Sequence, residues 1–364
     1  MTGREREILE LIKKNPLISQ GEISKILGIT RSSVAVHITN MTKKGYILGK
    51  GYIVKEGDYV SIVGGANIDI QGFPRKKLML SDSNPGEVKV SLGGVGRNIG
   101  ENLVKLGIET RLISIVGDDL YGNRILEEAK LIGLNMDDSL VIKGHATSTY
   151  LSILNEKGDM TAAISHMDIY DNMTVEFIKN KKYVVENSRL CVIDTNIPKE
   201  VIEYLVTGCR NTIFFLDTVS AAKAKKVKDF IGYFHAVKPN KIEAEMLTGK
   251  KIIDEKSLED AAKILLYKGV KRVFISLGED GVYYNDGVSS GHIKPPKIKV
   301  INATGAGDAF VAGLVYGYIN EFDTDLSARF AMAASILALS HENTINPNMS
   351  IENINKKMKE IGLC

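Results

Sequence analysis

The chain has few cysteines, and none of them form a closely spaced pair. Its 364 residues include three cysteines, and no C-x-x-C motif is present. An odd number of widely spaced cysteines predicts neither a disulfide framework nor a zinc site. A composition of 44% hydrophobic and 25% charged residues argues against a disordered or fibrous chain. We therefore expect a globular protein of a reducing compartment.

Long hydrophobic segments are also absent. The first twelve residues alternate charged and apolar side chains, which does not resemble a secretory signal. The most apolar stretch, residues 330–339, is too short to cross a bilayer and follows Arg329. We expect a cytoplasmic protein with no membrane partner.

Two common nucleotide-binding motifs are missing. The sequence contains no G-x-x-x-x-G-K followed by Ser or Thr, so a P-loop enzyme is excluded. A G-x-G pattern is present at Gly94 and Gly96. However, no acidic residue follows it at the distance that a dinucleotide-binding βαβ unit requires. This absence argues against NAD.

Positive charge is concentrated at the N-terminal end. Residues 1–56 hold ten Lys or Arg and five Asp or Glu, whereas the whole chain has a net charge of only +3. The remainder of the chain is therefore slightly acidic. A basic segment at one end suggests a partner of its own, and nucleic acid is the usual one.

Helix signals divide this basic segment into three short helices. Apolar residues at helical spacing predict a first helix that ends before Pro16. Ser19 and Glu22 form a capping-box pattern that opens a second helix, and Gly28 ends it. Thr30 is placed to cap a third helix.

Two helices joined by a glycine turn predict a helix-turn-helix whose last helix is the recognition helix. Residues 46–54 predict a β-hairpin with a basic tip, the wing of a winged helix. The segment resembles the winged helix-turn-helix domains of bacterial regulators. A small helical appendage used for oligomer contacts is the alternative. The residues expected to meet DNA are Arg31, Ser32, Ser33, His37 and Lys50.

The rest of the chain, residues 57–364, alternates short apolar runs with helical patterns. Such runs suit strands buried on both faces of a parallel sheet. Helices are predicted between them, for example over 98–106 and 257–268. This order predicts an α/β doubly wound sheet that binds ligands beyond the C-terminal ends of its strands. The expected strands are 59–65, 112–117, 190–194, 213–217 and 273–278.

Two stretches break this alternation, at about 70–92 and 146–164. The first has few helix signals and the second has the pattern of a β-hairpin. We predict that they form a small β-sheet that acts as a lid, because a phosphoryl-transfer site must exclude water.

The strongest chemical motif is Thr-Gly-Ala-Gly-Asp-Ala-Phe at residues 304–310, ahead of an apolar helix. Small residues at a helix start expose backbone N–H groups, which form an anion site together with the helix dipole. A carboxylate beside a phosphate is repelled, so Asp308 makes sense as the base that deprotonates an attacking hydroxyl. For this motif alone, an ordinary helix start with an Asp favoured by the dipole is an equally good explanation.

Two other motifs can also be explained in two ways. Asn240 and Glu243 fit a helix cap and its box partner, or groups that orient Mg²⁺-bound water and phosphate. Gly278 and Gly281 follow a predicted strand and fit either a tight turn or a nucleotide loop.

A second pair of motifs points to an acceptor site. Asn67 and Asp69 lie on one side of an extended segment and fit either the grip of vicinal hydroxyls or turn caps. The glycines of the run 93–98 allow a substrate to approach the backbone closely.

Taken in order, these motifs resemble those of the ribokinase-like (PfkB) family of carbohydrate and nucleoside kinases. The family combines G-x-N-x-D, G-G-x-x-x-N, P-N-x-x-E and G-A-G-D motifs, and all four are present after Tyr59. The resemblance implies an α/β core with a small β lid, ATP with Mg²⁺, and Asp308 as the base. It also implies an anion hole at Gly305, Ala306 and Gly307, acceptor contacts from Asn67, Asp69, Gly93, Gly94, Asn98 and Thr149, and ATP contacts from Asn240, Glu243, Gly278, Gly281 and a helix around Asn343, with Glu243 meeting Mg²⁺ through water.

A finer resemblance is to the subgroup of this family that phosphorylates pseudouridine, carried by residues 82–86, 93–99, 147–152 and 238–245. It implies transfer of the ATP γ-phosphoryl group to the 5′-hydroxyl of pseudouridine. The alternatives are a kinase for another nucleoside or ribose, and a transcription regulator that uses a kinase fold as a ligand sensor. Most of the family has Asp where Asn302 stands, and that Asp helps hold a monovalent cation, so cation activation stays open. We further expect a homodimer.

Overall fold

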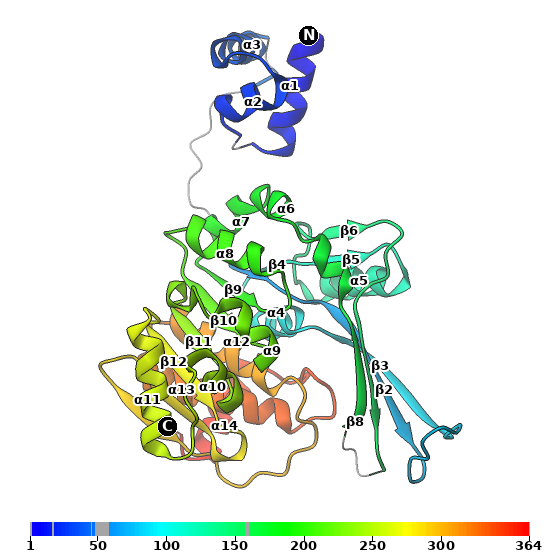
Figure 1. The fold of residues 1–364 in the computed structure, drawn as a ribbon, viewed down its shortest axis with the longest axis vertical. Coiled ribbons are helices and arrows are strands. Elements are labelled where there is room, and N and C mark those ends of the chain that lie inside the picture. The colour runs from blue at the N-terminus through cyan, green and yellow to red at the C-terminus, as the bar shows by residue number, and fades with distance from the viewer. Residues whose placement is uncertain (1, 17, 45, 48–57, 157–159, 364) are drawn as a thin grey trace. The chain divides into compact units, whose positions relative to one another are not determined.

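The structure is a computed structural model that describes residues 2–363 apart from 17, 45, 48–57 and 157–159 (Figure 1). The chain forms two compact units, residues 1–56 and residues 57–364. Within the described residues, no helix is both long and apolar enough to cross a membrane.

The first unit consists of three helices, as the capping signals predict. They are α1 (Gly3–Lys14), α2 (Gln20–Leu27) and α3 (Arg31–Lys43). Ser19 and Glu22 form the predicted capping box of α2, and Thr30 caps α3 through the N–H of Ser33. The helices enclose a small core of Ile8, Ile23, Val34 and Met41.

Two of the residues expected to face out from the predicted recognition helix α3, Ser33 and His37, are half-buried. His37 is half-buried rather than facing out, and its Nδ1 atom is buried without a hydrogen-bond partner. The helical period turns this side chain toward the core face that Val34 and Met41 define. The predicted wing at 46–54, with Lys50, lies largely outside the described residues.

The second unit is built on an eight-stranded sheet, as the apolar runs predict. Six of its strands, β1, β4, β9, β10, β11 and β12, run parallel, and β13 and β14 are added antiparallel at one edge. The order across the sheet is β14 (Ser290–Ile293), β13 (Val282–Asn285), β12 (Arg272–Ser276), β11 (Ala236–Lys238), β10 (Phe214–Asp217), β9 (Leu190–Asp194), β1 (Val60–Val63) and β4 (Thr110–Ile113).

Helices cover both faces of this sheet, because successive strand residues point to opposite faces and both sets are apolar. In β1, Ile62 belongs to one core and Val63 to the other. One core is closed by α4 (Val95–Lys105), α5 (Leu120–Ile132), α12 (Ala306–Ile319), α13 (Thr324–Leu339) and α14 (Ile351–Glu360). The other is closed mainly by α6 (Val175–Lys179), α7 (Lys182–Asn187), α8 (Lys199–Gly208), α9 (Ala221–Ala224), α10 (Lys241–Thr248) and α11 (Glu255–Tyr267). The predicted doubly wound α/β architecture is confirmed.

The single strand expected over 112–117 is wrong, because the chain changes its pairing partner at Ser114. Residues up to Ile113 belong to β4, whereas β5 (Ile115–Gly117) pairs with β6 (Leu140–Ile142) in a separate small sheet. The backbone of Ser114 bonds to the 139–140 segment instead. A continuous apolar run carries no signal for such a change of partner.

The lid sheet has four strands and projects from the body of the unit (Figure 1). Its order is β3 (Gly86–Gly93), β2 (Asn67–Pro74), β7 (Thr149–Leu154) and β8 (Met160–His166). It begins earlier than predicted, because β2 follows β1 after only a short glycine-containing link, residues 64–66. The base of the lid is therefore attached directly to the end of β1, the strand next to the edge strand β4.

Candidate active site

The C-terminal ends of four parallel strands meet at one edge of the central sheet. Gly64 follows β1, Asp194 ends β9, Asp217 ends β10 and Lys238 ends β11. In open α/β sheets, ligands bind in the crevice beyond these strand ends. Most of the predicted site residues lie on segments that begin at this edge.

The glycine-rich start of α12 has the backbone geometry of an anion site. Gly305 is the N-cap with φ of 82°, and no side chain caps the helix. The N–H groups of its first turn are therefore open to a ligand, and the helix dipole favours an anion there. A Cβ atom on Gly305 would collide with the carbonyl oxygen of Thr344, so this position requires glycine.

Asp308 lies in the first turn of α12 and is only 8% exposed. Its Oδ2 accepts a 2.8 Å hydrogen bond from Nδ2 of Asn98. Burial, with the negative charges of Asp217 and Asp194, raises the pKa of Asp308 to about 7, against the lowering effects of Asn98 and Lys238. A carboxylate with a pKa near neutrality, beside an anion site, is suited to general base catalysis.

Close backbone contacts bring Asn98 to Asp308. Gly94 has φ of 96°, and a Cβ there would collide with the carbonyl of Gly65. Gly96 packs in the same way against Gly64, with its Cβ position 3.0 Å from the Gly64 backbone. These glycines let α4 start directly on the loop after β1, and α4 packs against α12.

Asn67 and Asp69 lie on one face of β2, as their spacing predicts. Nδ2 of Asn67 donates to Oδ1 of Asp69 at 2.6 Å. Burial raises the pKa of Asp69, although Asn67 and Arg97 oppose this. Gly93 pairs with Asn67, and a Cβ on Gly93 would collide with the Asp69 carboxylate. The structure therefore brings these predicted acceptor residues together.

Thr149 does not join them. It pairs with Ile68, so its side chain lies on the opposite face of the lid sheet from Asn67 and Asp69. The residue that shares their face is Tyr150, which pairs with Asp69. A hairpin pattern shows which residues alternate but not the register against β2, and a slip of one residue exchanges the faces.

Asn240 and Glu243 form a complete capping box at the start of α10. The Glu243 carboxylate accepts from the backbone N–H and Nδ2 of Asn240, at 2.8 and 2.7 Å, and from Oγ1 of Thr218 at 2.6 Å. A carboxylate offers about four acceptor sites, so these bonds leave room for roughly one further donor. This fits a single water-mediated contact with Mg²⁺ and excludes direct bidentate ligation.

A pocket of about 500 Å³ lies next to this cap. Asn240 and Gly278 line it, and apolar side chains such as Ile242 and Leu258 contribute to its wall. Charged and polar residues such as Lys241, Asp280 and Lys294 complete the lining, so the pocket offers both an apolar wall and polar groups to a small molecule. Gly281 and Asn343 do not line the pocket; Gly281 has φ of 92° and stands against the Ile293 carbonyl.

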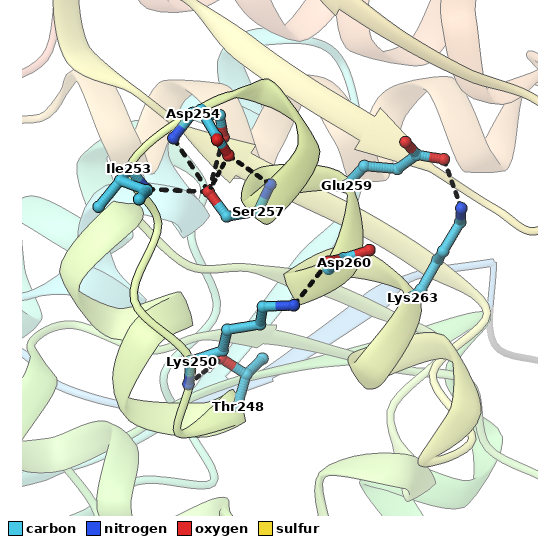
Figure 2. A network of polar contacts seen from close by, with 8 residues as sticks. All are labelled: Thr248, Lys250, Ile253, Asp254, Ser257, Glu259, Asp260 and Lys263. Atoms are coloured by element: carbon cyan, nitrogen blue, oxygen red, sulfur yellow. Dashed lines mark hydrogen bonds and ion pairs between the residues drawn. The ribbon is translucent and has the colours of Figure 1, made fainter.

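Hydrogen bonds hold the wall of this pocket that is formed by the start of α11 (Figure 2). Asp254 caps the helix through the N–H of Ser257, and Oγ of Ser257 accepts from the backbone of Ile253 at 2.9 Å. Lys250 is tied to Asp260 by an ion pair. These contacts hold both ends of the segment 250–257, which includes the pocket-lining residues 252–255.

The helix expected around Asn343 is wrong. This residue lies in the loop between α13 and α14, where its N–H donates to Nδ1 of His341. The loop contacts the start of α12 instead, because Nδ2 of Asn302 donates to the carbonyl of Glu342 at 2.8 Å. Oδ1 of Asn302 accepts from the N–H of Thr304, so the amide braces the loop and supplies no anionic ligand for a monovalent cation.

Three charged residues at the site, of which two are buried and one is largely buried, were not singled out from the sequence. Asp194 and Asp217 end strands β9 and β10, and Lys238 ends β11. Asp194 accepts from the N–H groups of Gly65 and Asn196, and Asp217 pairs with Lys238 at 3.1 Å. The available signal for Asp194 and Asp217 was their position, since each ends an apolar run that was predicted as a strand.

In the first unit, α3 presents Arg31 and Ser32 to solvent, and Ser33 is half-buried. Oγ of Ser32 lies 3.2 Å from Oγ1 of Thr30. The start of α3 therefore offers one exposed cation and hydroxyl groups on a rigid helix, which suits contacts with a phosphate backbone or base edges.

Comparison with known proteins matches both units to described families. A model of the pfkB family of carbohydrate kinases matches residues 58–351, and a winged helix-turn-helix DNA-binding model matches residues 1–47. An uncharacterized sugar kinase, YeiI, of Escherichia coli K12 is 36% identical over 97% of this chain and 98% of its own length. A pseudouridine kinase of the same organism is 41% identical over 83% of this chain and 96% of its own length. The crystal structure of a putative sugar kinase from Clostridium perfringens has a TM-score of 0.75 and 44% identity, and covers 84% of this chain and 96% of that one.

Proposed function

Because this chain belongs to the pfkB family of carbohydrate kinases, and is thus a phosphotransferase with an alcohol acceptor, we propose that it phosphorylates the 5′-hydroxyl of pseudouridine with ATP. The observation that carries the proposal is the Asn98–Asp308 pair at the uncapped start of α12. The 41% identity to a pseudouridine kinase supports the choice of acceptor.

In this proposal, Asp308 accepts the proton of the 5′-hydroxyl as that oxygen attacks the γ-phosphorus. The new O–P bond forms while the bond from the γ-phosphorus to the β,γ-bridging oxygen breaks, and ADP leaves. The N–H groups of residues 305–307 stabilise the charge on the transferring group. Asn98 donates to one carboxylate oxygen of Asp308 and thereby leaves the other free for the proton.

The acceptor is held by the base of the lid. The Asn67–Asp69 pair lies where β2 leaves the body, and its amide and carboxylate suit a pair of vicinal ribose hydroxyls. The pocket beside Gly278 suits the adenine and ribose of ATP, with Asn240 nearest the phosphates. When bound, Mg²⁺ would neutralise part of the phosphate charge. Asn240 and Glu243 would hold the ion through water. No step of the proposed reaction needs a monovalent cation.

A panel of acceptors tests the assignment. We expect kcat/KM for pseudouridine to exceed that for uridine, inosine, cytidine and ribose, measured by ADP release from the full chain with ATP and Mg²⁺. A clear preference for ribose or for another nucleoside would reject pseudouridine and leave the family assignment intact.

The pH dependence of the reaction follows from Asp308. Its pKa of about 7 means that the ionised, proton-accepting form grows as pH rises through neutrality. We expect kcat/KM to rise about tenfold per pH unit below that value and to level off above it. An aspartate with an ordinary pKa near 3.9 would give a flat profile over pH 5–9. A flat profile would therefore contradict the role given to this buried carboxylate.

We propose DNA binding as a second function, carried by the match of residues 1–47 to a winged helix-turn-helix DNA-binding model. Replacing exposed Arg31 by alanine should weaken binding to DNA from upstream of the protein's own coding sequence. It should also lower the salt slope by about one. Fluorescence anisotropy at several salt concentrations measures both effects. Arg4→Ala is the matched control, since Arg4 lies on α1 and pairs with Glu7. A larger effect of Arg4→Ala than of Arg31→Ala would contradict the assignment of α3.

A further inference from the structure

A largely buried ion pair lies at the carboxyl ends of β10 and β11, beside the helix turn that carries the proposed base. Nζ of Lys238 is 3.1 Å from Oδ2 of Asp217, and the two side chains are 12% and 6% exposed. The register of β10 and β11 places these residues side by side. A Cβ atom on Gly307 would come within 3.0 Å of Nζ. The ammonium group therefore borders the helix turn that carries Asp308.

The turn after β10 fixes the carboxylate that holds this ammonium. Oδ1 of Asp217 accepts from the N–H of Val219 at 2.8 Å, while Oδ2 faces Lys238. Val219 has φ of 59°, which is rare for a β-branched residue and costs backbone strain. Thr218 of the same turn donates to Glu243. Both carboxylate oxygens of Asp217 and the hydroxyl of Thr218 are thus engaged, which indicates that the position of Asp217 is held firmly.

Three charged groups and one hydrogen-bond donor, from four elements, act on Asp308. Asp194 of β9 and Asp217 of β10 are negative, Lys238 of β11 is positive, and Asn98 of α4 donates a hydrogen bond. Lys238 is the only cation among these groups. Its ammonium is paired with the Asp217 carboxylate, and an opposite charge at this distance favours the charged form.

We propose that Lys238 is a positioning residue whose ammonium keeps Asp308 ionised, and that its ion-pair partner Asp217 opposes this effect through its own charge. This inference rests on the proposed kinase function. The competing explanation is an ion pair that serves only the fold. Buried ion pairs are often no better for stability than apolar residues, which weakens that explanation. The two explanations differ in what they predict for the pH profile.

The two members of the pair should move the profile in opposite directions. Lys238→Met removes the attracting charge, so the acid limb of kcat/KM should move to higher pH. Activity at pH 6 should then fall about tenfold for every pH unit by which the limb moves. Asp217→Asn removes a repelling charge, so the limb should move to lower pH. If the pair serves only the fold, breaking it would lower the unfolding temperature and leave the acid limb of each variant in place.

Two further variants protect the test against loss of folding. The double variant Asp217→Asn with Lys238→Met leaves no unpaired buried charge, and its limb should lie between those of the single variants. Lys263→Met removes an exposed cation paired with Glu259 on α11 and should leave the profile unchanged. Limbs that move in the same direction, or a double variant outside the interval, would overturn the inference.

The profiles are to be measured on the full chain with the acceptor that the panel shows to be best. If no nucleoside or sugar is phosphorylated, the proposed function fails and this inference with it. If phosphorylation is observed but the limbs do not separate, only the role of Lys238 fails.

Discussion

Replacing Asp308 by asparagine is expected to lower kcat by about 10³-fold or more, because general base catalysis contributes roughly 10²–10⁴-fold and the neutral amide accepts no proton. The side chain keeps its shape, and its oxygen still accepts from Nδ2 of Asn98. ATP binding should therefore persist. Steady-state kinetics with the best acceptor and a direct measurement of ATP affinity check both parts.

The stability of this variant gives an independent control. The pKa of Asp308 is raised to about 7 in the folded protein, so ionising this group costs stability, and the cost grows with pH until it is complete above that value. Below the unfolded-state pKa of about 3.9 the cost is absent. At pH 8, Asp308→Asn should thus unfold at the same or a higher temperature than the parent. Asp323→Asn serves as a matched substitution, since Asp323 caps α13 and asparagine caps equally well. Unchanged turnover in Asp308→Asn would remove this residue from the chemistry.

The second large effect is expected for Gly305→Ala. A left-handed residue with a Cβ atom costs about 1–2 kcal/mol by itself, and here the Cβ would also collide with the Thr344 carbonyl. The start of α12 must shift to relieve the collision, which moves the N–H groups of the anion site. Loss of one such donor costs about 10²–10³-fold in kcat. We therefore expect a loss of that size together with a lower unfolding temperature.

Gly287→Ala separates strain from collision. Gly287 has φ of 83°, nearly that of Gly305, but a Cβ there meets no atom within 4 Å. It should show the backbone cost alone and keep normal kcat. If both variants lose activity equally, or if neither does, the anion site does not depend on the contact between Gly305 and the loop at Thr344.

The sequence predicted the architecture well because its signals are local. Apolar runs showed the strands, and Ser19, Thr30 and Asn240 showed helix starts through their capping hydrogen bonds. The placing of Asn67 and Asp69 on one face followed from the two-residue period of a strand. The match to the pfkB family then confirmed the fold class and the type of enzyme.

What the sequence could not provide depends on register and on distant partners. Thr149 lies on the opposite face of the lid sheet from Asn67 and Asp69, and the hairpin pattern alone does not give this register. The change of sheet at Ser114 and the loop at Asn343 depend on contacts with residues far along the chain. The Asp217–Lys238 pair arises only when two parallel strands end side by side. The Asn98–Asp308 bond joins residues 210 positions apart.

The most direct test of the account is the identity of the product. The full chain is incubated with ATP, Mg²⁺ and pseudouridine, and the nucleoside product is examined by ³¹P and ¹³C NMR. The account predicts one ADP per phosphorylated nucleoside, with phosphorus coupled to the 5′ carbon of pseudouridine. ADP formed without a phosphorylated nucleoside, or phosphate on a 2′- or 3′-hydroxyl, would contradict it.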